Sequence, residues 1–285
     1  MTLPKLSFEF FPPKSAKAKG QMQDAMDVLA GFAPEFISVT CGTGGGSAEQ
    51  TQDTVTGLTK AHGVTGAAHI TTTIGTKDEI AGHLDALEAA GITKVVALRG
   101  DYTADAQPVN GGYTSSVALV EAIAKRGGFD IYVGAYPESH PDAASAKQNI
   151  DFLKAKLDAG AKAAITQYFF EAETYLSFRD ECTAQGITAP LIPGILPVHD
   201  WNAVQRFSAK CGASIAERVK QAYDRAIRDD RVELLSLSQG STLVDRLITE
   251  GVDGLHFYTL NRAELTTQIC EAVGYSRADA LSKVA

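Results

Sequence analysis

Eight short apolar runs, each followed by a segment with helical periodicity, constrain the fold of this chain more than any other feature. The runs are rich in β-branched and aromatic residues, and the first seven begin about every 30 residues, the length of one strand–helix–strand unit. Because they are almost continuously apolar, the runs are typical of strands buried on both faces of a parallel sheet. The expected strands span residues 6–11, 36–41, 67–73, 94–100, 130–137, 163–170, 191–198 and 254–260.

Eight strands alternating with helices predict an α/β fold, a closed (β/α)8 TIM barrel rather than an open doubly wound sheet. Residues 199–253 interrupt the rhythm, because they are long enough for about two extra helices before the eighth strand. No linker or sharp change in composition divides the 285 residues, so we expect a single domain over 1–285. Ser47-x-x-Gln50 and Thr76-x-x-Glu79 predict capping boxes at two helix starts.

Charge and cysteine content indicate which kinds of partner and which cellular compartment to expect. The net charge is −8 and no Lys/Arg-rich run occurs, so we expect no nucleic-acid partner. No segment reads as a signal peptide or a membrane span, so we expect no membrane association. The four cysteines are scattered without a CxxC pair, which indicates free thiols in a reducing compartment, by default the cytoplasm.

Polar side chains stand where almost every expected strand ends. In a barrel of this kind, reactive groups belong at the carboxyl ends of the strands and in the loops just after them. The pattern therefore indicates a functional site at that end, although it specifies no reaction. The residues at these exits are Glu9, Thr40, His69, Arg99, Asp101, Tyr136, Glu138, His140, Gln167, Asn261 and Arg262.

Glu9 is the most unusual of these residues, because aromatic side chains surround it in the sequence Phe8-Glu9-Phe10-Phe11. Desolvation there should raise its pKa and suit it to act as a general acid near neutral pH. The alternative is a structural carboxylate paired with a neighbouring Arg or Lys.

Two glycine-containing segments allow more than one interpretation. Arg99-Gly100-Asp101 places a cation and an anion around a glycine that lets a ligand approach the backbone, or it forms an ordinary ion pair at the barrel rim. The glycine-rich segment 41–47 precedes a helix and could offer amides to a phosphate. It lacks the GxGxxG spacing of dinucleotide-binding loops, and a plain flexible turn explains it nearly as well.

A metal site has less support. His69, Glu138 and His140 could be combined with Asp101 as ligands, but no two of the histidines have HxxxH spacing and no cysteine joins them. We therefore expect no metal.

Eight motifs in order make the chain resemble the bacterial methylenetetrahydrofolate reductases. The resemblance covers nearly the whole chain and is weakest over 210–250. The motifs are SFEFFPPK at 7–14, SVT at 38–40, AH at 68–69, ALRGD at 97–101, AYPESHP at 135–141, ITQYFF at 165–170, IPGILPV at 192–198 and HFYTLNRAE at 256–264.

The resemblance implies an FAD-binding barrel that reduces 5,10-methylenetetrahydrofolate to 5-methyltetrahydrofolate. NADH or NADPH would reduce the flavin and leave, and the folate would then bind against the same flavin face, a ping-pong order. A homo-oligomer is also expected.

The resemblance also implies roles for individual residues. Glu9 would be the general acid, and Asp101 would lie beside the flavin and contact the pterin. The substrate-binding residues would be Gln167, Phe207, Arg262 and Thr40. The flavin-binding residues would be Cys41, Thr43, His69, Arg99, Gly100, Asp101, Tyr136, His140 and Lys156.

The chain departs from the family pattern at Asn149, Phe152 and Ala155, where relatives commonly carry Asp, Asn and Arg along a flavin-facing stripe. Losing one such contact would weaken flavin binding by about 1–3 kcal/mol. Ala203 stands where a substrate-contacting glutamine is often found, so more of the pterin recognition would fall to Gln167.

Three alternatives stay open at this point. One is a flavin barrel with another hydride acceptor, of the proline-dehydrogenase type, which the Glu9 motif disfavours. A flavin-free reductase would pass hydride directly from nicotinamide to folate. A non-enzymatic folate-binding barrel would leave the acid and the Arg-Gly-Asp segment without a purpose.

Overall fold

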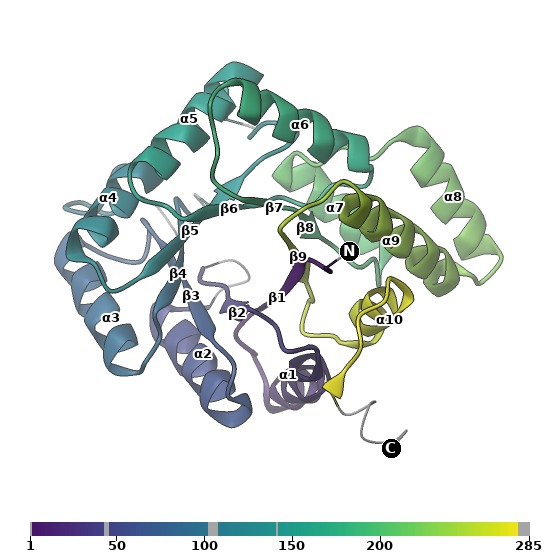
Figure 1. Ribbon diagram of the computed structural model, residues 1–285. Helices are drawn as coiled ribbons and strands as arrows, with labels where there is room; N and C mark the ends of the chain where they lie inside the picture. The colour runs from purple at the N-terminus through teal and green to yellow at the C-terminus, as the bar shows by residue number, and fades with distance from the viewer. Residues whose placement is uncertain (1, 43–45, 102–107, 141, 279–285) are drawn as a thin grey trace.

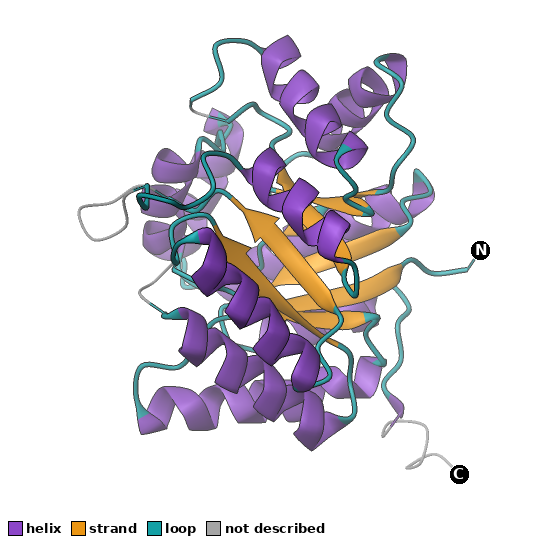
Figure 2. Cartoon of the chain, turned by 90° about the vertical axis from the view of Figure 1, so that its left-hand side faces the viewer, coloured by secondary structure: helices purple, strands orange, loops and turns teal. Residues whose placement is uncertain are grey.

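A ring of parallel strands surrounded by helices forms the body of the molecule (Figure 1). The computed structural model describes residues 2–42, 46–101, 108–140 and 142–278. Strand order is β7-β6-β5-β4-β3-β2-β1-β9-β8, and each hydrogen-bonded pair along it is parallel. The predicted TIM barrel is therefore confirmed. Figure 2 shows the strands as an inner layer covered by helices.

The elements follow the predicted alternation. The strands are β1 (Lys5–Phe10), β2 (Phe36–Val39), β3 (Gly66–Thr71), β4 (Lys94–Leu98), β5 (Asp130–Ala135), β6 (Ala163–Thr166), β7 (Leu191–Ile192), β8 (Gly194–Ile195) and β9 (Gly254–Tyr258). The helices are α1 (Ala16–Leu29), a 3-10 turn (Ala30–Phe32), α2 (Ala48–His62), α3 (Lys77–Ala89), α4 (Ser116–Arg126), α5 (Ala146–Asp158), α6 (Ala172–Ala184), α7 (Trp201–Cys211), α8 (Glu217–Arg228), α9 (Val232–Thr249) and α10 (Glu264–Ala272). In the described part of the chain, no helix is long and apolar enough to cross a membrane.

The seventh strand is divided in two, which the sequence did not predict. Pro193 separates β7, which pairs with β6, from β8, which pairs with β9. A proline has no N–H to donate to a neighbouring strand, but the Pro193 carbonyl still accepts the backbone N–H of His256 at 3.0 Å. The ring therefore closes through this interruption.

Three helices, α7, α8 and α9, lie between β8 and β9, two more than one crossover needs, as predicted. Figure 1 shows α8 outside the ring of helices. The start of this excursion has a small apolar cluster of its own, separate from the main core. The cluster contains Val198, Trp201, Val204, Val219 and Tyr223.

Alternation along each strand divides the core into two parts. Outward-facing residues pack against the helices in the main core. Inward-facing residues form a plug inside the barrel, made of Phe36, Ala67, Val96, Tyr132, Ala163, Ile165 and Ile192. Both predicted capping boxes are present, at the starts of α2 and α3.

Substitution of Gly194 and of Gly82 by alanine should have opposite effects on stability, which tests this packing. A Cβ at Gly194 in β8 would collide with the Thr166 carbonyl oxygen and the Tyr258 ring, whereas nothing lies within 4 Å of a Cβ at Gly82 in α3. We expect Gly194→Ala to lower the free energy of unfolding by about 3 kcal/mol. Gly82→Ala should raise it by about 0.5–1 kcal/mol, because alanine favours a helix. Urea unfolding of both variants measures this, and equal effects would contradict the packing described.

Candidate active site

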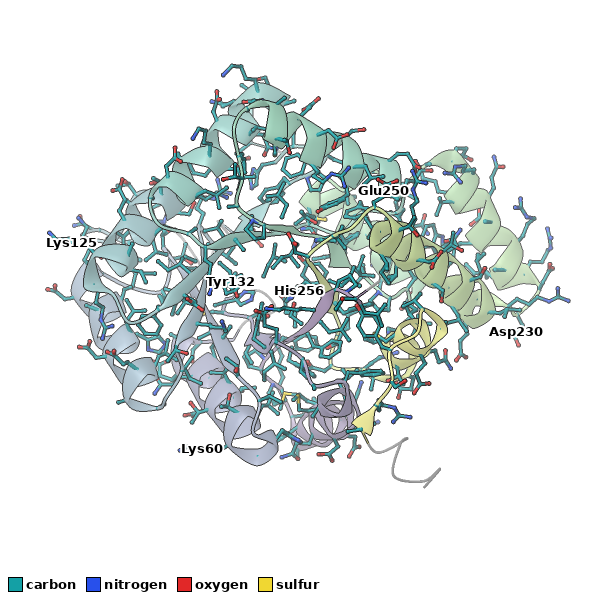
Figure 3. All side chains as sticks on the ribbon, viewed as in Figure 1. Lys60, Lys125, Tyr132, Asp230, Glu250 and His256 are labelled. Atoms are coloured by element: carbon teal, nitrogen blue, oxygen red, sulfur yellow. The ribbon has the colours of Figure 1, made fainter. Side chains whose placement is uncertain are left out.

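The carboxyl end of the barrel brings together polar side chains from three strands. On β1, Ser7 and Glu9 face the interior, and Ser7 lies opposite His256 of β9 in the strand register. His69 of β3 reaches the same space, with its Nε2 beside the Glu9 carboxylate. Figure 3 shows His256 within the ring of strands and Lys60 at the outside.

Glu9 lies between two imidazoles. Its Oε2 is 3.3 Å from Nε2 of His69 and 3.6 Å from Nε2 of His256. On the far side of the His256 ring, Nδ1 lies 2.8 Å from Oγ of Ser7, a contact that orients the ring. The Glu9 side chain is 19% exposed and that of His256 is fully buried. The Glu9 carboxylate is therefore accessible to a ligand, while the buried His256 ring contacts it from inside the barrel.

This arrangement reverses the expected pKa shift of Glu9. Burial raises the pKa, but the close contacts of the carboxylate with the imidazoles of His256 and His69 lower it by more, to about 2. The sequence-based expectation of a raised pKa was wrong because aromatic neighbours along the chain suggested an apolar pocket. The actual neighbours come from β3 and β9, and they favour the carboxylate.

Tyr258 connects Glu9 to the next group of polar residues. Its hydroxyl donates to the Thr166 carbonyl at 2.7 Å, and its pKa is raised by burial and by the negative charge of Glu9. Sequence reasoning did not select Tyr258 or His256. Their alternation in Gly254-Leu255-His256-Phe257-Tyr258 was the available signal, because it places both side chains on the inward face of one strand.

A second group surrounds the end of β5. The rings of Tyr136 and His140 meet edge to face at 4.6 Å. Asn149 of α5 holds this loop, because it donates to the Tyr136 carbonyl at 2.8 Å and accepts from the His140 backbone N–H at 3.2 Å. Burial and the positive charges of Arg99 and Lys156 lower the pKa of His140. The structure thus brings four of the expected flavin-binding residues into one neighbourhood.

Two cations in this group have different partners. Arg99 pairs with Asp142 at 2.7 Å. Lys156 is 5% exposed and donates to the Gly134 carbonyl, and no carboxylate among the described residues forms an ion pair with it. Burial lowers its pKa to about 8. A buried ammonium without a described counter-ion fits an anionic ligand such as a diphosphate.

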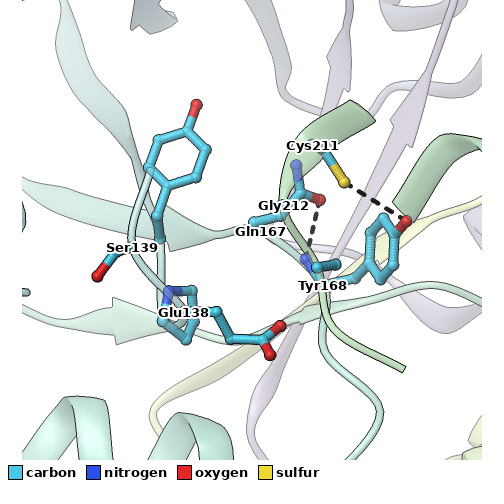
Figure 4. A pocket seen from close by; sticks show the side chains of 9 residues that line it. Glu138, Ser139, Gln167, Tyr168, Cys211 and Gly212 are labelled. Atoms are coloured by element: carbon cyan, nitrogen blue, oxygen red, sulfur yellow. Dashed lines mark hydrogen bonds between the residues drawn. The ribbon is translucent and has the colours of Figure 1, made fainter. Parts of the chain in front are cut away.

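A small, open cleft lies beside this group (Figure 4). Tyr136 and Gln167 lie on its wall, and Gln167 accepts the Tyr168 backbone N–H at 3.0 Å. The Phe207 ring stacks on Tyr168 with the centroids 5.9 Å apart, and it remains 43% exposed. The Gln167 amide and the exposed Phe207 ring, each of which contacts Tyr168, suit a flat, hydrogen-bonding ligand. The lining residues are Tyr136, Pro137, Glu138, Ser139, Gln167, Tyr168, Cys211, Gly212 and Ala213.

Thr40 and Cys41 are buried at the end of β2. The Thr40 hydroxyl has no hydrogen-bond partner among the described residues, so it could serve a ligand, and burial raises the pKa of the Cys41 thiol. Asp101 and Arg262 are exposed. Thr43 lies outside the described residues.

Gly100 adopts φ +83°, and a Cβ there would crowd Thr71 and Thr73. Glycine therefore suits this turn. No group of metal-ligating side chains occurs within the residues described. Glu138, a possible ligand by sequence alone, accepts hydrogen bonds from Ser214.

Comparison with known proteins identifies relatives of the whole chain. A family described as methylenetetrahydrofolate reductase matches residues 3–274. The chain is 37% identical to 5,10-methylenetetrahydrofolate reductase of Pectobacterium carotovorum and 38% identical to that of Escherichia coli, in each case over 94% of this chain and 90% of the relative.

Among solved structures, one similar fold is an uncharacterised Clostridium thermocellum protein that binds two copies of 5-methyl-5,6,7,8-tetrahydrofolic acid. It aligns with a TM-score of 0.65 at 13% identity, over 95% of this chain and 94% of that one. At this identity, the likeness concerns the fold.

The lowered pKa of Glu9 predicts a pH-dependent contribution to stability. A carboxyl group whose pKa falls from 4.5 to about 2 on folding stabilises the protein above pH 4.5, and this contribution is lost as the pH falls towards 2. Between pH 5 and pH 3, the stability of the wild type should fall by about 2 kcal/mol more than that of Glu9→Gln. Urea titrations at both pH values measure the difference. A difference that does not change with pH would refute the histidine contacts as the cause.

Proposed function

This chain belongs to the methylenetetrahydrofolate reductase family, and from that premise we propose that it reduces 5,10-methylenetetrahydrofolate with electrons from NADH or NADPH through bound FAD. The observation that carries the proposal is the Glu9 carboxylate held between His69 and His256 at the open end of the barrel. The reaction consumes one hydride and one proton, so the enzyme needs a proton donor beside the folate.

The proton reaches the folate through Glu9 and the two histidines beside it, His69 and His256. With a pKa of about 2, Glu9 is a carboxylate near neutral pH before substrate binds, so it must take up a proton before it can act as an acid. The imidazoles of His69 and His256 lie 3.3 and 3.6 Å from its Oε2, and an imidazole can pass a proton to it. Glu9 accepts that proton and donates it to the folate nitrogen whose bond to the methylene carbon breaks. The resulting iminium carbon accepts the hydride. Glu9 thus remains the proposed general acid, but it receives its proton from a histidine and does not hold one through a raised pKa.

The folate would lie in the cleft beside Gln167 and Phe207. The amide supplies hydrogen bonds to the pterin, and the exposed Phe207 ring offers a surface for stacking. Binding of 5-methyl-5,6,7,8-tetrahydrofolic acid by a protein of similar fold is consistent with a folate ligand. Arg262 and Asp101, both exposed at the rim, would contact substrate or nicotinamide, and the unpartnered Thr40 hydroxyl would contact nicotinamide.

FAD fits the group at the end of β5. Lys156 and Arg99 would supply positive charge for its diphosphate, and Tyr136, His140 and His69 would contact its ring system. When bound, FAD would accept a hydride from NADH or NADPH and pass it to the folate, with the two substrates binding in turn. Gly100 allows the flavin to approach the backbone. Cys41 and Thr43 are proposed flavin contacts from the family resemblance alone.

Direct hydride transfer without flavin is the second candidate, and α5 favours it. Asn149 already serves the Tyr136–His140 loop. Phe152 is exposed and Ala155 is half-buried, and neither offers a polar group to a dinucleotide. A visible spectrum of the purified protein, with and without added FAD, distinguishes the two mechanisms. Cytoplasmic location and homo-oligomerisation stay predictions.

Glu9→Gln separates the two half-reactions. Reduction of bound flavin by NADH or NADPH needs no proton from Glu9, so we expect its rate to stay within about twofold. Folate reduction should fall by at least about 100-fold, the usual scale for removal of a general acid. Anaerobic stopped-flow measurement of each half-reaction provides the test. An equal loss in both would make Glu9 a structural residue.

Ala155→Arg tests the placement of FAD along α5. Position 155 precedes Lys156, so an arginine there should add a cation near the diphosphate and slow FAD loss on dilution by about tenfold. Gln21→Arg adds the same charge at an exposed position on α1 and serves as the control. Flavin fluorescence after dilution reports dissociation independently of turnover. If both variants release FAD like the wild type, FAD does not bind along this helix.

A further inference from the structure

The loop between α7 and α8, residues 212–216, forms one wall of the cleft. Gly212 and Ala213 of this loop line it together with Cys211, the last residue of α7. Figure 4 shows Cys211, Gly212, Gln167 and Tyr168 close together, with a dashed line joining Cys211 to Tyr168. Because Cys211 ends α7 and Gly212 caps it, the position of the end of this helix shapes the cleft.

The α7–α8 segment reaches the barrel through a few side-chain contacts. Trp201, at the start of α7, stacks on Tyr223 of α8 with the centroids 4.0 Å apart, and its ring also meets that of Phe170, which follows β6, edge to face at 6.2 Å. Further along α7, the Ser208 hydroxyl lies 2.8 Å from that of Tyr168, a residue that follows β6. The beginning of α8 forms an ion pair with Glu171 through Arg218.

Glu138, which lines the cleft, makes a further contact with this segment. Its Oε2 accepts the backbone N–H of Ser214 at 2.9 Å, and its Oε1 accepts the Ser214 hydroxyl. The two residues are 76 positions apart in the chain, so this contact joins the β5 exit loop directly to the α7–α8 loop. Both oxygens of the carboxylate are used by one residue, an arrangement that fixes orientation as well as distance.

We propose that Glu138 is a positioning residue, which latches the α7–α8 loop through Ser214 and so holds the wall of the cleft beside Gln167 and the Phe207 ring in place for substrate. The proposed chemistry assigns no role to Glu138. The identity of the substrate as a folate rests on the proposed function, but the latch itself does not.

Hydrogen bonding, and not charge, is what the latch requires. In Glu138→Gln, the amide oxygen can still accept the Ser214 N–H, and the amide N–H can donate to the Ser214 hydroxyl oxygen. Glu138→Ala removes both contacts, and Ser214→Ala removes one. The three variants therefore distinguish two roles for Glu138. If it positions the loop, Glu138→Gln should behave like the wild type, and if its negative charge matters, Glu138→Gln should behave like Glu138→Ala.

Alkylation of Cys211 reports the state of the loop without any cofactor. The Cys211 thiol is half-buried and donates to the Tyr168 hydroxyl at 3.5 Å, whereas Cys41, Cys182 and Cys270 are buried. We expect Glu138→Ala to raise the rate of Cys211 modification by iodoacetamide, followed by peptide mass spectrometry, about five- to tenfold. Ser214→Ala should give a smaller rise, and Glu138→Gln should stay within about twofold of the wild type.

Arg218→Gln is the matched control, because it removes a different tether of the same segment, one whose partner Glu171 does not line the cleft. It should leave Cys211 reactivity within about twofold. Double substitution of Glu138 and Ser214 by alanine should match Glu138→Ala alone, since Ser214→Ala removes only a contact that Glu138→Ala has already removed. Additive effects of the two substitutions, or unchanged Cys211 reactivity in Glu138→Ala, would overturn the latch.

Steady-state kinetics supply the second readout. A loosened wall should raise KM for methylenetetrahydrofolate about five- to tenfold in Glu138→Ala with kcat within about twofold, and Glu138→Gln should restore KM. Equal impairment in Glu138→Ala and Glu138→Gln would overturn the positioning role and assign the effect to charge. If the wild type reduces no folate, the proposed function fails, while the alkylation series still decides on the latch.

Discussion

The apolar plug inside the barrel is the constraint on which the rest of the structure depends. Phe36 and Tyr132 meet inside the ring with their centroids 4.8 Å apart, and the Lys94 ammonium covers both rings and pairs with Asp130 at 2.8 Å. This packing fills the amino-terminal half of the interior. Inward-facing polar residues near the strand ends therefore stand on an apolar floor, and a ligand must enter from the carboxyl end.

The plug also explains why Glu9 needs its partners. A carboxylate placed just above apolar side chains loses much of its hydration, which is unfavourable unless other groups replace the water. His69 and His256 do so from β3 and β9, and Ser7 orients the His256 ring. The same contacts that make the buried charge tolerable also connect it to groups that can carry a proton. Stability and chemistry thus depend on one set of contacts.

The barrel and the α7–α8 segment hold their site residues in different ways. Strand-borne groups such as Glu9 and His256 are held by the closed sheet and cannot shift without disturbing many hydrogen bonds. Phe207 and Cys211 belong to a segment with its own small apolar cluster, which reaches the barrel through individual side-chain contacts. In this arrangement the chemical groups stay rigid, while the wall that faces the substrate depends on contacts such as that between Glu138 and Ser214.

The sequence by itself determined a parallel sheet covered by helices, because continuous apolar strands repeating about every 30 residues must bury both faces, and the number of strands favoured the closed barrel over an open sheet. It also indicated the end of the barrel where Glu9, His69, Arg99 and Gln167 gather, since strand exits share one rim. Only the tertiary structure decided which side chains touch. The pKa of Glu9 is low because residues about 60 and 250 positions away approach it, and the electrostatic energy of a buried charge depends on distance in space rather than separation along the chain.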